Sequence, residues 1–180
     1  MKFEVYQGEV CMGEKQLYLG RRNKIDNEIG ISEKFMDMAI ADEKTAELLL
    51  KNRYYNQAIY FYIQSMEKYI KCFICKKINV TNPYFAERLR ELGHSLDRAT
   101  DFFIEIVSGN DEILKQQINT QLKQNVFRNI RFSVIYNAVR YPFYKNNAYM
   151  VTEMSKKDCD VLREIYDSLK QYMTQVYMKL

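Results

Sequence analysis

One apolar stripe in the middle of the chain constrains the fold more than any other feature. Within residues 54–76, large apolar side chains recur at alternating spacings of four and three residues: Tyr55, Ile59, Tyr62, Met66, Tyr69 and Phe73. Positions with this spacing lie on one face of an α-helix. Further apolar residues widen that face, namely Ala58, Ile63, Ile70 and Ile74. A stripe this wide predicts a central helix that packs against several neighbours.

Few residues in the chain would stop a helix. The 180 residues include six glycines and two prolines, and 47% of them are hydrophobic and 28% charged. This composition favours a mostly helical globule. A chain of this length suits one domain, which buries about 70% of the surface that its unfolded form would expose. We therefore expect an all-α fold, an up-and-down bundle of four to five helices.

Capping residues predict where the first and third helices begin. Ser32 is the expected N-cap of a helix that runs to about Lys51. Only a few residues separate the end of this helix from the start of the central helix, which makes the two helices antiparallel neighbours. A third helix opens at Pro83, because proline suits the first helical position. Gly93 interrupts its pattern, and Ser95 is a suitable cap for a continuation, so we expect a bent or broken helix.

The second half of the chain predicts two more helices. Apolar residues that recur every four positions indicate one long fourth helix: Ile118, Leu122, Val126, Ile130 and Val134. Pro142 helps to end it, and a loop over 143–154 follows. Ser155 with Asp158 three positions later is typical of a capping box that starts the last helix.

The N-terminal residues differ from the rest of the chain. Residues 1–30 hold four of the six glycines, which separate short alternating or aromatic runs such as KFEVYQ and QLYLG. These runs predict a short β-hairpin or an ordered arm, packed on the bundle or reaching a partner chain. We expect residues 1–31 to form this arm or extension and residues 32–180 to form the helical bundle.

Composition excludes several classes of protein. Neither a signal peptide nor an apolar window of about 18 residues is present, so we expect no membrane span and a cytoplasmic location. Four cysteines with only Cys72 and Cys75 close together, and a single histidine, favour free thiols over a metal site, and no cofactor motif occurs. A net charge of +4 permits contact with nucleic acid without arguing for it.

Three segments, in this order, resemble the HEPN family (higher eukaryotes and prokaryotes nucleotide-binding domain). They read ELLLKNRYYNQAIYFYIQSMEKYIK, LRELGHSL and NAVRYPF. The matching positions are Tyr55, Ala58, Gln64, Glu67, Lys68, Lys71, His94, Leu96, Arg140, Tyr141 and Pro142. The resemblance covers about residues 32–179. It implies a bundle of four to five helices, commonly a homodimer, and a link to nucleotide or RNA biology.

Many members of the family that the chain resembles are metal-independent RNases of toxin–antitoxin and phage-defence systems, often paired with a nucleotidyltransferase antitoxin. Their motif is an arginine, commonly followed by a polar residue, and a histidine after four to six residues. Histidine moves a proton near neutral pH, and arginine stabilises charge on phosphate. Arg128 and Asn129 match the start, but Ser133 stands where the histidine would be. The other match pairs Arg88 with His94, across Gly93.

Several side chains near these segments are candidates for binding a ligand: Arg140, Tyr141, Lys68, Lys71 and Arg131. Arg140, at a helix end, suits bidentate contact with phosphate, or equally the capping of the last carbonyls. Lys68 and Lys71 form either a basic edge near nucleotide phosphate or, through Glu67 and Lys71, an ion pair on one helix face. Arg131 and its aromatic neighbours suit base stacking, or simply alternate around an amphipathic helix.

Three functions follow from these residues. We expect a HEPN-like helical module that dimerises and associates with nucleotide or RNA in a toxin–antitoxin or defence-type system, without an intact catalytic motif. The alternative is an active endoribonuclease toxin that uses Arg88 and His94, or Arg128, and so whether the chain is an enzyme stays open. A third function is a helical adaptor whose N-terminal arm grips a partner. The expected partners are a second copy, a nucleotidyltransferase-type antitoxin or other protein, and RNA or nucleotide, with no membrane.

Overall fold

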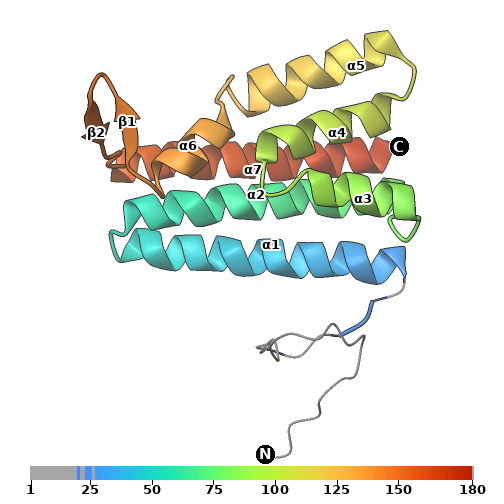
Figure 1. Ribbon diagram of the computed structural model, residues 1–180. Coiled ribbons are helices and arrows are strands. Elements are labelled where there is room, and N and C mark those ends of the chain that lie inside the picture. Colours follow the sequence, from blue (N-terminus) through green and yellow to red (C-terminus); the bar gives the residue numbers. More distant parts are fainter. Residues whose placement is uncertain (1–19, 21–22, 26, 180) are drawn as a thin grey trace, which may run out of the picture.

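Three long helices run side by side and form the body of the molecule (Figure 1). The computed structural model describes residues 20, 23–25 and 27–179, without the side chains of 177–179. The long helices are α1 (Glu28–Lys51), α2 (Tyr55–Lys77) and α7 (Lys156–Lys179). Helix α2 packs against α1, α7 and the shorter helix α4 (Leu96–Ser108). The predicted central helix is therefore confirmed.

The stripe along α2 supplies much of the core. Its side chains are buried from Ile59 to Phe73, and Tyr62, Met66 and Ile70 are fully inaccessible to solvent. A polar contact joins three helices beneath them. The Ser65 hydroxyl donates to the Ala39 carbonyl at 2.6 Å and lies 2.7 Å from the Tyr166 hydroxyl. A satisfied polar cluster thus joins α1, α2 and α7 within the apolar core.

The remaining elements are shorter and lie on one side of α2 and α7. They are α3 (Pro83–Glu91), α4, α5 (Glu112–Asn119), the π-helix η1 (Thr120–Val126), α6 (Phe132–Ala138), β1 (Phe143–Lys145) and β2 (Ala148–Met150). The all-α fold is confirmed, since the sheet has only two short antiparallel strands. Figure 1 places α6 and the β1–β2 hairpin near the start of α7, at the end of the bundle where α1 turns into α2.

Most of the predicted caps are confirmed. Pro83 opens α3 behind the cap Asn82, and Gly93 (φ 57°) separates α3 from α4. The Ser95 hydroxyl then accepts from the Arg98 N–H at 3.3 Å. At the start of α7, the Asp158 carboxylate accepts from the Ser155 N–H at 2.8 Å, which is the expected capping box.

The predicted start of the first helix is wrong. Helix α1 begins at Glu28, because the Asn27 side chain accepts from the Gly30 N–H at 2.7 Å and caps the helix earlier. Ser32 lies inside the helix, where it is buried and its hydroxyl donates to the Ile29 carbonyl at 2.9 Å. A serine that can bond back to its own helix does not have to cap it.

The predicted long fourth helix is also wrong. The chain forms α5, widens into the π-helix η1, and breaks over residues 127–131 before α6 begins. Ile118, Leu122 and Val126 are buried as predicted, but Val134 is 62% exposed. Arg128 and Asn129, which match the start of the family motif, therefore lie in a break between helices, not on a helix.

The only hairpin in the described residues lies in the second half of the chain. Its strands, β1 and β2, fall in the segment predicted as a loop, and they pair Phe143 with Met150 and Tyr144 with Tyr149. The hairpin or arm predicted over residues 1–31 lies almost wholly outside the described residues. None of the described helices is both long enough and apolar enough to cross a bilayer.

Candidate functional site

The break between η1 and α6 carries the start of the predicted catalytic motif. Arg128 (φ 53°) and Asn129 (φ 58°) both adopt the left-handed conformation. Asparagine tolerates this conformation, whereas an arginine there costs on the order of 1 kcal/mol. The N–H of Asn129 donates to the Lys123 carbonyl at 2.8 Å, and the buried rings of Phe127 and Phe132 pack edge to face 5.1 Å apart. These contacts hold the turn in its strained conformation.

The first turn of α6 is capped by a residue from another helix. Asp97, in α4, accepts from the N–H groups of Phe132 and Ser133 at 3.2 and 2.9 Å. Arg131 stands at the N-cap position of α6 and provides no side-chain cap. Asp97 therefore supplies the acceptor that a local N-cap would give, and it ties Ser133 to the start of α4.

The motif arginine is held by a carboxylate of α7. Arg128 donates to Glu164 at 3.2 Å, with 47% and 63% of the two side chains exposed. Ser133, at the position expected for histidine, is exposed at the start of α6. The structure thus places a guanidinium and a hydroxyl at the break, and neither group is a general base at neutral pH.

Of the alternative pair, Arg88 lies near the end of α3 and His94 lies in the α3–α4 turn. The Arg88 guanidinium is directed toward α4: it lies 3.8 Å from Glu105 and 5.3 Å from the centre of the Phe102 ring. It also reaches Glu91 at 3.4 Å within α3. His94 is exposed in the turn before α4. Arg88 is therefore engaged in local ion pairs, while the imidazole of His94 is accessible to solvent.

The two candidate lysines on α2 face the protein. Lys68 forms an ion pair with Asp42 of α1. Lys71 is 7% exposed, pairs with Glu67 one turn earlier, and donates to the Gly93 carbonyl at 2.6 Å. These contacts tie α2 to α1 and to the α3–α4 turn. Of the two interpretations of Lys71, the geometry favours the ion pair within the helix.

Arg140 lies at the other end of α6, stacked among tyrosines. Its guanidinium carbon is 4.8 Å from the centre of the Tyr136 ring, 4.7 Å from that of Tyr141 and 5.5 Å from that of Tyr60. Its Nη2 also donates to the Tyr141 hydroxyl at 2.8 Å. Such stacking pre-organises the planar guanidinium and leaves part of its fork for an anion. Arg140 and Tyr141 are both exposed.

The tyrosine beneath Arg140 stays protonated at neutral pH. Burial of the Tyr136 ring, a hydrogen bond with Tyr60 and the nearby Glu67 charge raise the pKa of Tyr136 to about 12, while Arg140 acts in the opposite direction. The rings of Tyr60 and Tyr136 stack 5.3 Å apart. The neutral Tyr136 phenol, stacked on Tyr60, therefore supports the guanidinium as a polar group and not as an acid or base.

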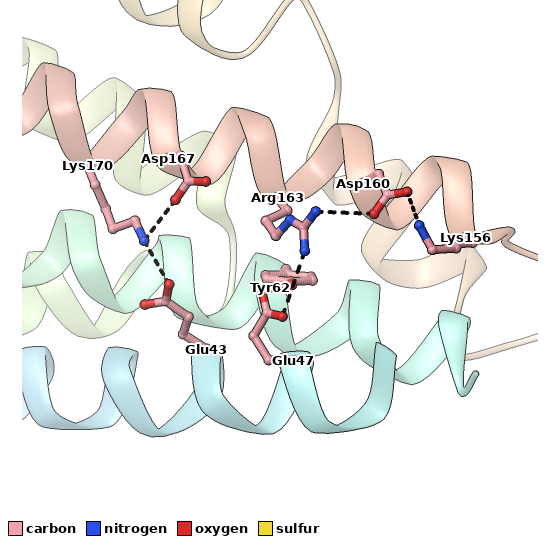
Figure 2. Close-up of polar contacts among 8 residues, drawn as sticks. All are labelled: Glu43, Glu47, Tyr62, Lys156, Asp160, Arg163, Asp167 and Lys170. Atoms are coloured by element: carbon pink, nitrogen blue, oxygen red, sulfur yellow. Dashed lines mark hydrogen bonds and ion pairs between the residues drawn. The ribbon is translucent and has the colours of Figure 1, made fainter. Parts of the chain in front are cut away.

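A second polar region joins α1 to α7 at their facing edges. Figure 2 shows Lys170 between Glu43 and Asp167, at 2.7 and 3.0 Å, and Arg163 between Glu47 and Asp160. An open cleft of about 450 Å³ adjoins Arg163 and Asp160. Opposite charges alternate there and pair with each other, so the region is a set of ion pairs that connects α1 to α7 rather than a site for a charged ligand.

No group of three or more histidine, cysteine, aspartate or glutamate side chains in the described part of the chain is placed to hold a metal ion.

Sequence reasoning missed residues that the structure shows to matter. Asp97 and Glu164 each lie 36 residues from the motif residue they contact, and Tyr60 reaches Arg140 from α2. Of these residues, only Asp97 has a recognisable sequence feature: it is an acidic residue in the first turn of α4. That position is already explained by a favourable interaction with its own helix, so it does not point to α6. Contacts between distant residues carry no periodicity.

A comparison with protein families identifies the chain's relatives. The model of the HEPN domain matches residues 32–176, which is most of the chain. The comparison with curated proteins and the comparison with solved structures give no match. The match spans the bundle from α1 to α7 and includes the break at Arg128, the turn at His94 and the Arg140 cluster. The chain therefore belongs to the HEPN domain family.

Proposed function

We propose that this chain is a dimerising HEPN module that associates with RNA or nucleotide without cleaving it, in a toxin–antitoxin or defence-type system. The observation that carries the proposal is the pair of groups at the break between η1 and α6. Ser133 stands where the family motif has histidine, and the Arg128 guanidinium is bound to Glu164.

The chemistry of RNA cleavage explains why this pair is insufficient. Cleavage without a metal needs one group to remove the proton of the 2′-hydroxyl and another to protonate the leaving oxygen. A serine hydroxyl does neither near neutral pH, and arginine stays charged. Arg128 is able to stabilise charge on phosphate, which suits binding.

The surface around α6 supports association with an anion. Arg131 at one end of this short helix and Arg140 at the other are both exposed. The tyrosines around Arg140 add flat rings next to a positive charge, a combination that binds bases and phosphate together. Dimerisation is supported by the 15 tyrosines and 10 phenylalanines, which exceed the need of one small core.

Three measurements on the purified chain test the proposal. Sedimentation at micromolar concentration should show a dimer. A labelled single-stranded RNA should bind, as measured by fluorescence anisotropy, and Arg140→Ala should weaken the binding. The same RNA should stay intact on a denaturing gel. A monomer would remove the dimer from the proposal, and absence of RNA and nucleotide binding would refute its central statement.

A second candidate, an active RNase toxin, rests on the exposed imidazole of His94. It predicts growth arrest on expression that His94→Ala abolishes while the purified variant keeps its circular dichroism spectrum. Arg128→Ala tests the other arginine in the same way. If expression of the unaltered chain leaves growth unchanged and the RNA of the host cells uncut, this candidate is eliminated.

A further inference from the structure

Positive charge is concentrated in one continuous part of the chain. Residues 113–152 contain no aspartate or glutamate, yet they hold six basic residues: Lys115, Lys123, Arg128, Arg131, Arg140 and Lys145. The chain as a whole has 27 basic and 23 acidic residues, so the rest of it has a small acidic excess. The net charge of +4 therefore arises from this segment, which forms α5, η1, α6 and the hairpin.

The structure divides these six basic residues into two groups. Lys115, Lys123 and Arg128 each form an ion pair, with Glu112, Asp101 and Glu164. Arg131, Arg140 and Lys145 form no ion pair with any acidic residue among those the structure describes. All three are exposed. Arg131 and Arg140 flank α6, and Lys145 lies on β1. The unneutralised charge is thus gathered at the end of the bundle with the hairpin.

The hairpin beside these charges exposes aromatic rings. Tyr144 and Tyr149 pair across the two strands, and their ring centres lie 5.3 Å apart. They are 63% and 77% exposed. The opposite face of the hairpin carries Phe143 and Met150, which are 39% and 46% exposed. A two-stranded hairpin with apolar side chains exposed on both faces buries little surface of its own, so a binding partner would gain much by covering it.

We propose that this surface binds single-stranded nucleic acid. The surface, here termed the α6–hairpin patch, comprises Arg131, Arg140, Tyr141, Tyr144 and Tyr149, together with Lys145, which strand alternation places on the opposite face of the hairpin. Bases stack on the rings of Tyr144 and Tyr149, the two guanidiniums contact the phosphates, and the flexible Lys145 stem reaches a phosphate around the edge of β1. This inference rests on the proposed function and assigns a location and a strand type to it.

The chemistry of the patch selects a single strand over a duplex. In a duplex the flat faces of the bases are covered by their neighbours, so exposed tyrosine rings would gain nothing from them. In a single strand every base offers a face, and stacking tolerates any sequence. The guanidinium of Arg140, held against Tyr141, adds an exposed planar group just before the hairpin begins at Phe143.

Two other occupants fit the patch less well. A second copy that paired through the same patch would bring two sets of three cations together without an acidic residue between them, which is unfavourable. A membrane would have to accept the hairpin tip, which reads Lys145-Asn146-Asn147 and is polar. A nucleic acid strand is complementary to both features of the patch, because its phosphates match the cations and its bases match the aromatic rings.

The test measures binding of a fluorescein-labelled 12-nucleotide poly(U) RNA by anisotropy. Tyr144→Ala/Tyr149→Ala should weaken binding roughly tenfold or more, as expected for the loss of stacked bases. Tyr84→Ala is the matched control, because Tyr84 is 66% exposed and packs edge to face on Phe85, at the far end of the bundle on α3. It should leave the affinity unchanged. With three phosphate contacts, raising the salt from about 50 to 200 mM should weaken binding roughly twentyfold.

A second readout does not depend on a folded variant. A 4-thiouridine oligonucleotide cross-linked to the unaltered chain should mark peptides from residues 141–150. If the chain binds RNA but cross-links elsewhere, and the double variant binds as well as the unaltered chain, this inference fails and the proposed function stands. If no single-stranded RNA binds, this inference fails, and the proposed function fails with it only if nucleotides do not bind either.

Two further outcomes would also overturn the inference. If the double variant turns a dimer into a monomer in sedimentation, the patch is a surface for self-association. If the chain floats with vesicles of anionic lipid and ignores the RNA, the patch faces a membrane.

Discussion

Replacing Asp97 by alanine should loosen the helix that carries the α6–hairpin patch. The Asp97 carboxylate caps α6 through two N–H groups, at 3.2 Å from Phe132 and 2.9 Å from Ser133. It also lies in the first turn of its own helix, α4, where a negative charge is favourable. The substitution removes all three interactions, and no other side chain caps α6 in the described residues.

The magnitude follows from the exposure of the groups. Loss of a side-chain cap costs about 0.5–2 kcal/mol, and a carboxylate acceptor belongs at the upper end of that range. Water replaces part of the bond at the exposed Ser133 N–H, which limits the cost there. Loss of the charge at the start of α4 adds about 0.5 kcal/mol. We expect Asp97→Ala to lower the free energy of unfolding by about 2 kcal/mol, and Asp97→Asn by about 1 kcal/mol because the amide keeps an acceptor.

Urea unfolding followed by circular dichroism measures the change, with Asp101→Ala as the control. Asp101 lies one turn further along α4 and pairs with Lys123 across the surface, with 59% and 41% of the two side chains exposed. An exposed pair of this kind contributes under about 1 kcal/mol. Hydrogen exchange at the Phe132 and Ser133 amides provides the site-specific readout, since both amides should exchange faster in Asp97→Ala.

Two results would refute this reasoning. Equal stability of Asp97→Ala and Asp101→Ala would mean that the cap contributes no more than a surface charge. Unchanged exchange at Ser133 would mean that α6 is held by its packing alone, through Phe132 and Tyr136, without help from Asp97.

Two further predictions concern the core. Burial raises the pKa of Cys75 to about 12 and that of Cys159 to about 11, both from 9.0, so in alkali the unfolded chain loses these protons first. The stability they contribute should be complete below pH 9 and should fall as pH rises toward 11, by at most about 1.4 kcal/mol per pH unit for each thiol. A lower urea midpoint at pH 10 than at pH 8, with a smaller difference in Cys75→Ala, checks this; equal midpoints would contradict it. Tyr166→Phe should cost about 1 kcal/mol in urea unfolding, because it removes the contact with Ser65, which keeps its bond to the Ala39 carbonyl. No loss of stability would show that the hydroxyl pair adds nothing to the packing.

Local signals in the sequence were sufficient for much of the fold. The stripe on α2 predicted its burial, and Pro83, Ser95 and the Ser155–Asp158 pair marked helix starts that the structure has. Each of these signals acts within a few residues, through helix periodicity or capping, so a single chain segment contains the whole interaction. The family resemblance rested on the same segments.

The fourth helix shows how a pattern can be misinterpreted. Residues spaced by four drift about 40° per step around an α-helix, so over the four steps from Ile118 to Val134 a straight helix would turn them to the opposite side. That drift was a signal against one continuous α-helix. The structure widens into η1, which keeps Leu122 and Val126 buried, and then breaks, which leaves Val134 exposed.

The sequence by itself determined the buried face of α2, the starts of α3, α4 and α7, and the absence of histidine at position 133, because these depend on neighbouring residues or on identity alone. Only the tertiary structure decided that Arg128 meets Glu164, that Asp97 caps α6, and that Tyr60 from α2 lies beneath Arg140. Such contacts join residues tens of positions apart, and the packing of whole helices selects them. The candidate site depends on those contacts, so its geometry was not predictable from the segments that form it.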